Sequence, residues 1–166
     1  KCDWSSDVCS SDLALTKQQV FTALAKQIPD KDGKLIDNPN KLWSDVDASL
    51  PATKIEVLGP PPTSGTRDSF AELVLEKGAE KYESLAALKK ADAKAYEAVW
   101  KAVREDGAYV EAGENDNLIV QKLEGNPNAV GIFGYSYLEA NASRLHGINV
   151  GGVAPSYSSI SDFTYP

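Results

Sequence analysis

The chain has 166 residues, of which 42% are hydrophobic and 25% are charged, and its formal net charge is −7. This length fits one ordinary domain with a substantial core, and no apolar run approaches the length that crosses a bilayer. The acidic balance argues against a nucleic-acid surface, whereas a cleft can still bind a small anion through backbone N–H groups and one arginine.

The first residues do not fit the rest of the sequence. CDWSSDVCSSDL (Cys2 to Leu13) resembles a translated sequencing adapter of the kind found in contaminated metagenomic assemblies, along the full length of the string. Both cysteines lie inside it, so they support no inference about the redox compartment. A disulfide and a weak metal pair are the alternatives. We expect residues 1–13 to be non-native and the chain to be a fragment of a longer protein.

The first predicted helix begins at Thr16. Apolar residues in LTKQQVFTALAKQIP recur at helical spacing as far as Ile28, and Pro29 is expected to end the helix. The segment from Asp30 to Lys41 is rich in turn residues. We expect Trp43, which follows it, to fill the core from a short turn.

A strand is predicted at about Lys54 to Leu58, and it runs directly into the loop GPPPTSGTRDSF. The helix that follows this loop should stop at Gly78. Its predicted buried residues are Phe70, Leu73 and Val74. One long helix, or two joined helices, should form over YESLAALKKADAKAYEAVWKAVRED, with a solvated charged face.

Two further strands are predicted at Ala108 to Gly113 and at Ala129 to Tyr135, each followed by a short helix. These helices lie in ENDNLIVQKLEGNP and SYLEANASRL. Strands that alternate with helices predict an α/β architecture. We find no internal repeat and no interdomain linker.

The loop before the second helix has the composition of an oxyanion site. A strand–loop–helix unit places the loop at a helix N-terminus, where the first N–H groups lack intrahelical acceptors and the helix dipole favours an anion by about 0.3–1 kcal/mol. In Ser64-Gly65-Thr66-Arg67 the hydroxyls can donate hydrogen bonds, the glycine allows close approach, and the arginine offers a planar fork to two oxygens. The same pattern is typical of an ordinary helix N-cap, so both interpretations stay open.

An enzyme would need a catalytic partner for Ser64. The only histidine, His146, lies in a polar loop, and the sequence has no Gly-x-Ser-x-Gly elbow, metal-ligand cluster or Walker-type lysine loop. We therefore expect a protein that is not an enzyme, with no metal and no cofactor. A Ser64-dependent hydrolase and an interaction module without a ligand remain the alternatives from other classes.

Three motifs, VLGPPPTSGTRDSFAELVLEKG, YVEAGENDNLIVQKL and NAVGIFGYSYLEAN, together resemble the phosphate-binding component of bacterial phosphate ABC transporters. These are periplasmic binding proteins of the second type, with two α/β lobes that close on one anion. The similarity runs from about Ala14 to the end of the chain. It implies one α/β anion-binding lobe over residues 14–135 and a return segment over 136–166 towards a largely missing N-terminal lobe.

The resemblance implies ligand contacts for four residues, Ser64, Gly65, Thr66 and Arg67. In the better-known form of the family, an arginine lies a few residues ahead of the Ser-Gly-Thr. This chain has Pro60-Pro61-Pro62 there, so Arg67 is taken as its substitute.

The next helix offers a further set of candidates at its start. Asn115, Asp116 and Asn117 could touch the anion, or they could simply cap the helix, which is the simpler interpretation. Tyr135 and Tyr137 are expected to pack at a hinge.

The resemblance also implies a biological role. The complete protein would capture inorganic phosphate in the periplasm and pass it to an inner-membrane permease and ATPase complex, without chemistry of its own. Sulfate and molybdate remain alternative ligands. Because the missing lobe normally supplies further donors, we expect the fragment to bind phosphate weakly or not at all.

Overall fold

The computed structural model describes residues 13–166, so the adapter-like segment lies outside the described residues except for Leu13. The centre of the fold is a three-stranded parallel sheet in the order β5–β4–β6. Its strands are β4 (Val57–Gly59), β5 (Tyr109–Glu111) and β6 (Val130–Gly131), and Val57 pairs with the first residue of each neighbour. Parallel strands joined by helices confirm the predicted α/β fold.

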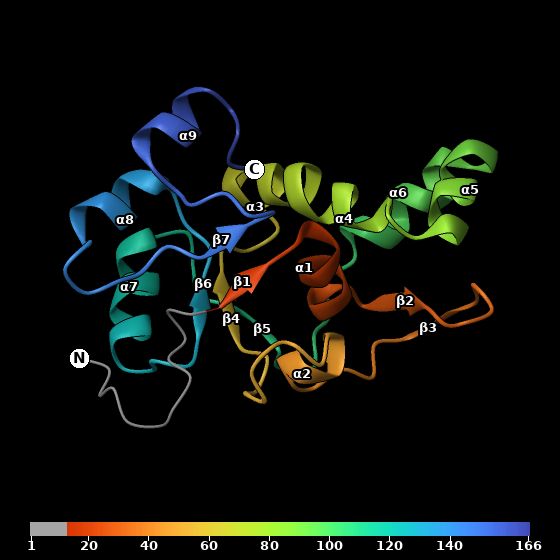
Figure 1. Cartoon of the computed structure of the whole chain (residues 1–166), viewed down its shortest axis with the longest axis horizontal. Coiled ribbons are helices and arrows are strands. Elements are labelled where there is room, and N and C mark those ends of the chain that lie inside the picture. Colours follow the sequence, from red (N-terminus) through yellow and green to blue (C-terminus); the bar gives the residue numbers. More distant parts are fainter. Residues whose placement is uncertain (1–12) are drawn as a thin grey trace.

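Helices pack on both faces of this sheet (Figure 1). Val57 and Tyr109 belong to the main core, which also contains α1 (Lys17–Leu24). Leu58, the next residue of β4, belongs to a second cluster with Ile119 of α7 (Asp116–Glu124). Because successive strand residues point to opposite faces, β4 is buried on both sides, as expected for the central strand of such a sheet.

Two smaller strand pairs flank the central sheet. β1 (Ala14–Leu15) pairs in parallel with β7 (Asn149–Val150), which brings the start of the described chain beside a segment late in the sequence. β2 (Gln27–Pro29) and β3 (Leu35–Asp37) form an antiparallel hairpin. The short helix α2 (Trp43–Val46) follows, and its first residue is only 1% exposed, which confirms the predicted core tryptophan.

The remaining helices lie at the periphery. α5 (Glu83–Ala91) and α6 (Ala93–Lys101) pack against each other at one end of the molecule, and α8 (Tyr135–Ala140) lies near α7 at the other (Figure 1). α9 (Tyr157–Ser161) is close to the C-terminus. Across residues 13–166, no helix has the length and apolar character needed to span a membrane.

α1 starts as predicted but ends earlier. Thr16 and Gln19 form a capping box, with each side chain accepting a hydrogen bond from the other residue's backbone N–H. The helix stops at Leu24, so the prediction that it continues to Pro29 was wrong. Asn38 Nδ2 donates to two carbonyls at the end of α1, at 2.7 and 2.8 Å. The Asn38 side chain thus donates to backbone carbonyls that a further turn of α-helix would otherwise pair. The helix can therefore end here, and the chain continues as β2.

The helix after the proline loop contains a π-helical segment. α3 (Gly65–Phe70), η2 (Ala71–Glu76) and α4 (Lys77–Ala79) follow one another without a break. Leu73, predicted to be buried, is 53% exposed, whereas Leu75 is fully buried. A π turn closes i to i+5 hydrogen bonds and so rotates the following side chains relative to a regular α-helix. The prediction of Leu73 as a buried residue assumed a regular α-helix and was therefore wrong.

The same helix passes through Gly78 and does not stop there, which corrects a second prediction. A Cβ atom at Gly78 would lie 2.2 Å from the carbonyl oxygen of Lys17. The glycine thus allows α4 to approach the first turn of α1 closely. Its role is in helix packing, and the helical segment ends one residue later, at Ala79.

Candidate anion-binding site

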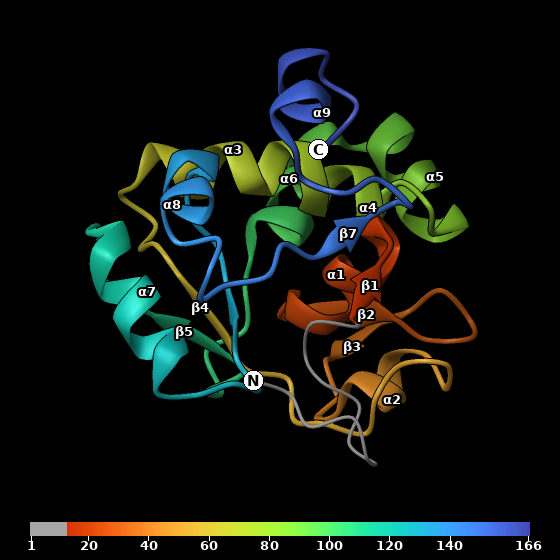
Figure 2. The same cartoon turned by 60° about the vertical axis from the view of Figure 1, so that its left-hand side comes forward.

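Three helices begin at the carboxyl edge of the central sheet. β4 leads through a loop at residues 60–64 into α3, β5 leads into α7, and β6 leads into α8. Figure 2 shows α7 and α8 on the same side of the molecule as the start of α3. Open α/β sheets bind ligands outside the carboxyl ends of their strands. The predicted anion loop therefore lies at the edge where this kind of fold carries a ligand.

Ser64 is the N-cap of α3. Its backbone is extended (φ −85°, ψ 134°), and its Oγ accepts a hydrogen bond from the backbone N–H of Thr66 at 3.2 Å. The capping interpretation is therefore correct for Ser64. A hydroxyl that accepts through a lone pair keeps its own proton as a donor, so the cap leaves the Ser64 O–H available to a ligand.

Gly65 and Thr66 form the exposed first turn of α3. Both residues are exposed, and a Cβ built at Gly65 would meet no heavy atom within 4 Å. Thus nothing inside the fold requires glycine at this position. A ligand that approaches the backbone at the helix N-terminus would give the glycine a role that packing does not.

Arg67 lies inside the fold, unlike the other three predicted residues. Its side chain is 8% exposed, and its Nη1 donates to the carbonyl oxygen of Pro60 at 3.4 Å. Its Cζ lies over the ring of Tyr109, 4.8 Å from the centroid. The structure places Ser64, Gly65 and Thr66 together at the start of α3. Arg67 instead lies against Pro60 and Tyr109, next to the end of β4.

Among the described residues, no carboxylate forms an ion pair with Arg67. The other two arginines differ, since Arg104 pairs with Asp106 and Arg144 pairs with Glu124. A buried cation is stabilised chiefly by an opposite charge. Within the described residues, the positive charge of Arg67 is therefore left without a paired negative charge.

Tyr109 does not supply the missing negative charge. Burial raises the pKa of its hydroxyl above the ordinary value, and the Arg67 charge only partly opposes that shift. Tyr109 is thus neutral at physiological pH. It donates its proton to the Pro60 carbonyl at 2.8 Å, and its ring supports the guanidinium.

The loop after β5 is tied to the anion loop. Thr63 Oγ1 donates to Glu114 Oε1 at 2.8 Å, which links the end of the proline loop to the segment before α7. Neither Tyr109 nor Glu114 was identified from the sequence as part of the site. The one local signal was Gly59, since a glycine at the end of a buried strand indicates close approach by another group.

The residues at the start of α7 act mainly within the fold. Asn115 Oδ1 accepts from the N–H of Asn117 at 3.0 Å, so Asn115 caps the helix, in agreement with the simpler prediction. Asp116 Oδ2 accepts from the N–H of Gly134 at 3.3 Å. This contact joins the start of α7 to the start of α8, which keeps two of the three helix N-termini in place beside each other.

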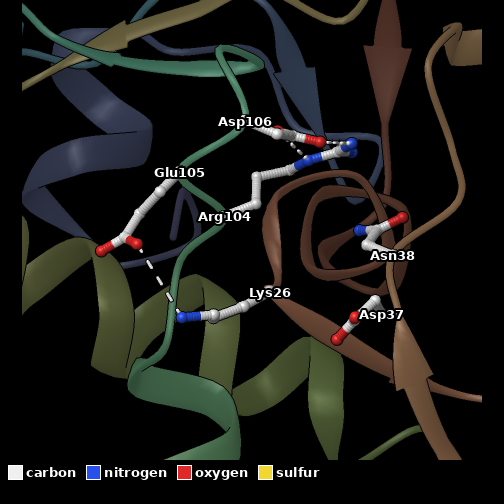
Figure 3. A pocket seen from close by; sticks show the side chains of 6 residues that line it. All are labelled: Lys26, Asp37, Asn38, Arg104, Glu105 and Asp106. Atoms are coloured by element: carbon white, nitrogen blue, oxygen red, sulfur yellow. Dashed lines mark hydrogen bonds and ion pairs between the residues drawn. The ribbon is translucent and has the colours of Figure 1, made fainter.

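A hollow of about 330 Å³ lies elsewhere, near the residues that precede β5 (Figure 3). Its lining residues are Lys26, Asp37, Asn38, Arg104, Glu105 and Asp106. The hollow is therefore at the amino edge of the sheet, away from the anion loop.

The groups around this hollow have structural partners. Arg104 is 4% exposed; its Nη1 donates to two carbonyls at 2.7 and 3.0 Å, and its Nε and Nη2 donate to the carboxylate of Asp106 at 2.8 and 2.5 Å. The guanidinium holds the pKa of Asp106 below its ordinary value. One of the two carbonyls belongs to Ala23, so Arg104 also closes the end of α1. We assign these groups to stability.

The catalytic alternative gains no support from the described residues. Ser64 Oγ is engaged by the N–H of Thr66, while His146 is exposed in the segment after α8. No hydrogen bond within residues 13–166 joins these two side chains.

The fold and the position of this loop define a lobe of the binding-protein type, in which a ligand is held at the carboxyl edge of an α/β sheet. Residues 5–166 match the PBP superfamily domain, and the chain belongs to this family. Its members are substrate-binding proteins. The predicted family and fold class are thereby confirmed.

Curated relatives share more than a quarter of the aligned residues. The phosphate-binding protein PstS of Staphylococcus haemolyticus is 29% identical over 117 residues, which are 70% of this chain and 28% of that protein. Protein SphX of Synechococcus elongatus is 29% identical over 128 residues, which are 74% of this chain and 30% of that protein. The alignments thus cover most of this chain and under a third of each relative.

Two solved structures share the fold. PstS from Borrelia burgdorferi superposes with a TM-score of 0.60 and 18% identity, covering 97% of this chain and 51% of that one. A possible phosphate binding protein from Planctomyces limnophilus gives a TM-score of 0.59 and 21% identity, with coverages of 95% and 46%. This chain spans about half the length of these structures, as expected for one lobe of a two-lobed protein.

Proposed function

We propose that this chain is the anion-binding lobe of a periplasmic substrate-binding protein that captures inorganic phosphate for uptake by an ABC transporter. The observation that carries the proposal is Arg67, a buried cation without a carboxylate partner in the described residues, at the third residue of a helix that begins at the carboxyl edge of the sheet. The names of the relatives, which include two PstS proteins and SphX, support phosphate as the anion.

The proposal assigns the parts of the chain as follows. Residues 14–135 form the anion-binding lobe, and residues 136–166 return towards a second lobe that completes the clamp. The partners are inorganic phosphate and the permease and ATPase complex in the inner membrane, and the protein acts in the periplasm. It binds no nucleic acid, does not itself span the membrane, and carries out no reaction.

Phosphate would be held by Ser64, Gly65, Thr66 and Arg67. The two hydroxyls donate hydrogen bonds, the glycine lets a phosphate oxygen approach the backbone, and the guanidinium supplies charge. Each charge-assisted hydrogen bond contributes about 1.5–3 kcal/mol, and the helix N-terminus adds about 0.3–1 kcal/mol. One lobe provides only part of the complete donor set, so we expect weak binding by this chain alone.

The test is a titration of the ¹⁵N-labelled chain with inorganic phosphate, followed by NMR at constant ionic strength up to millimolar concentrations. We expect the backbone signals of residues 64–67 to move, and Arg67→Gln to weaken binding by about 10- to 150-fold. Arg144→Gln is the matched control, because Arg144 is exposed and already paired with Glu124. Sulfate and molybdate titrations measure the selectivity.

Two results would overturn this proposal. One is the absence of any phosphate-dependent change at residues 64–67 in a folded chain. The other is an equal loss of affinity in Arg67→Gln and Arg144→Gln, which would mean that phosphate responds only to the overall charge of the molecule.

A further inference from the structure

The ring of Tyr109 occupies the space that a side chain at position 59 would take. Tyr109 is the first residue of β5, is 6% exposed, and pairs with Val57. A Cβ atom at Gly59 would lie 2.2 Å from Tyr109 Oη and 2.7 Å from Cζ. The glycine at the end of β4 therefore admits the ring beside the start of the anion loop.

From this position Tyr109 contacts both the loop and its arginine. Its hydroxyl donates to the Pro60 carbonyl at 2.8 Å, and the Arg67 guanidinium lies over its ring at 4.8 Å from the centroid. Arg67 reaches the same carbonyl at 3.4 Å, which is longer than the usual range of about 2.7–3.2 Å for N–H···O bonds. The guanidinium therefore lies on the ring of Tyr109 and makes only a long hydrogen bond to the loop.

We propose that Tyr109 is a positioning residue, which holds the Arg67 guanidinium in place for an oxyanion bound at residues 64–67; this inference rests on the proposed function. An aromatic face attracts a cation from above and leaves the N–H donors in the guanidinium plane available. A carboxylate would instead neutralise the charge and occupy two donors, as Asp106 does for Arg104. Tyr109 stabilises a buried arginine without competing with the ligand.

The first test compares two substitutions of Tyr109 by titration with inorganic phosphate. Tyr109→Leu removes the ring and is expected to weaken binding about 3- to 30-fold, the range that corresponds to a partly buried cation–π contact. Tyr109→Phe keeps the ring and should stay within about threefold of the parent chain. Rescue by phenylalanine would assign the effect to the ring face.

Tyr96→Leu is the matched control. Tyr96 is also buried, its hydroxyl also donates to a backbone carbonyl, that of Glu76 at 2.9 Å, and Lys89 Nζ lies 5.4 Å from its ring centroid. It differs in lying against η2, away from the anion loop. Tyr96→Leu should lower the folding stability in a similar way and leave phosphate affinity at the parent value.

A double-mutant cycle then separates positioning from general destabilisation. In an Arg67→Gln background, Tyr109→Leu should cause no further loss of phosphate affinity, because the residue that it positions is already absent. An equal loss in both backgrounds, or unchanged binding in Tyr109→Leu, would overturn the inference. So would a loss in Tyr96→Leu as large as that in Tyr109→Leu.

A readout without phosphate keeps this inference separate from the proposed function. The chain has three arginines, and Arg67→Gln identifies the Arg67 Nε–Hε signal by its disappearance. The ring current of Tyr109 should shift that signal, and Tyr109→Leu should remove the shift while Tyr109→Phe retains it. If the Nε–Hε shift follows this pattern but the parent chain does not bind phosphate, the proposed function is wrong and the contact between Arg67 and Tyr109 is confirmed. If the Nε–Hε shift is the same in the parent chain and in Tyr109→Leu, the positioning role of Tyr109 is wrong.

Discussion

Gly59→Ala tests the packing on which the anion loop depends. The added methyl group would lie 2.2 Å from Tyr109 Oη, 2.7 Å from Cζ and 2.9 Å from Cε2, all well inside ordinary contact distance. The ring is rigid and buried, and Arg67 lies over its face. The clash therefore cannot be relieved by a simple turn of a side-chain end, and either β4 or the ring must move.

The expected loss of stability follows from this geometry. Extra methyl groups in a packed core cost about 1–3 kcal/mol, and three close contacts with a rigid ring place Gly59→Ala in the upper half of that range. For a domain of this size, each kcal/mol corresponds to about 2–4 °C in the melting temperature. We expect the melting temperature to fall by about 4–12 °C.

Thermal unfolding followed by circular dichroism measures this effect. Gly125→Ala is the matched control: Gly125 ends α7 with φ −82°, and the nearest atom to an added Cβ is 3.7 Å away. It should be neutral or more stable by up to about 1 kcal/mol. In a Tyr109→Val background, which removes the ring, the penalty of Gly59→Ala should largely disappear. Equal stability of Gly59→Ala and the parent chain would refute the packing of Tyr109 against β4 and with it our account of Arg67.

Three further sets of substitutions test the scaffold by urea unfolding. Asp106→Asn should lower the free energy of unfolding by about 1–2 kcal/mol at neutral pH, because buried Arg104 loses its half-exposed partner. The Arg104 guanidinium holds the pKa of Asp106 below its ordinary value in the folded chain. The contribution is therefore fully present above that ordinary value, and the difference from the parent should vanish as the pH falls through the lowered, folded-state pKa. Thr16→Ala should remove about 0.5–2 kcal/mol through loss of the capping box, and Thr16→Ser should restore it. Leu75→Ala should cost about 2–5 kcal/mol and Leu73→Ala under about 0.5 kcal/mol; the reverse order would contradict the π-helical segment.

Much of the fold could be predicted because its signals are local. Thr16 begins α1 and Ser64 begins α3, since a hydroxyl before an apolar helix satisfies the first N–H groups wherever it occurs. The alternation of strands and helices likewise fixed the fold class. The end of α1 could not be predicted, because the groups that close it come from Asn38 and Arg104 in other segments.

The sequence by itself determined where an anion could bind: Ser64, Gly65 and Thr66 are neighbours in the chain and start one helix, so no distant contact is needed to bring them together. Only the tertiary structure decided where Arg67 lies and what supports it. Its companion Tyr109 comes from the neighbouring strand, and the hydrogen bond between Tyr109 and Pro60 joins positions 49 residues apart. Such a contact depends on the register of two parallel strands and on the space left by one glycine, which no periodicity along the chain encodes.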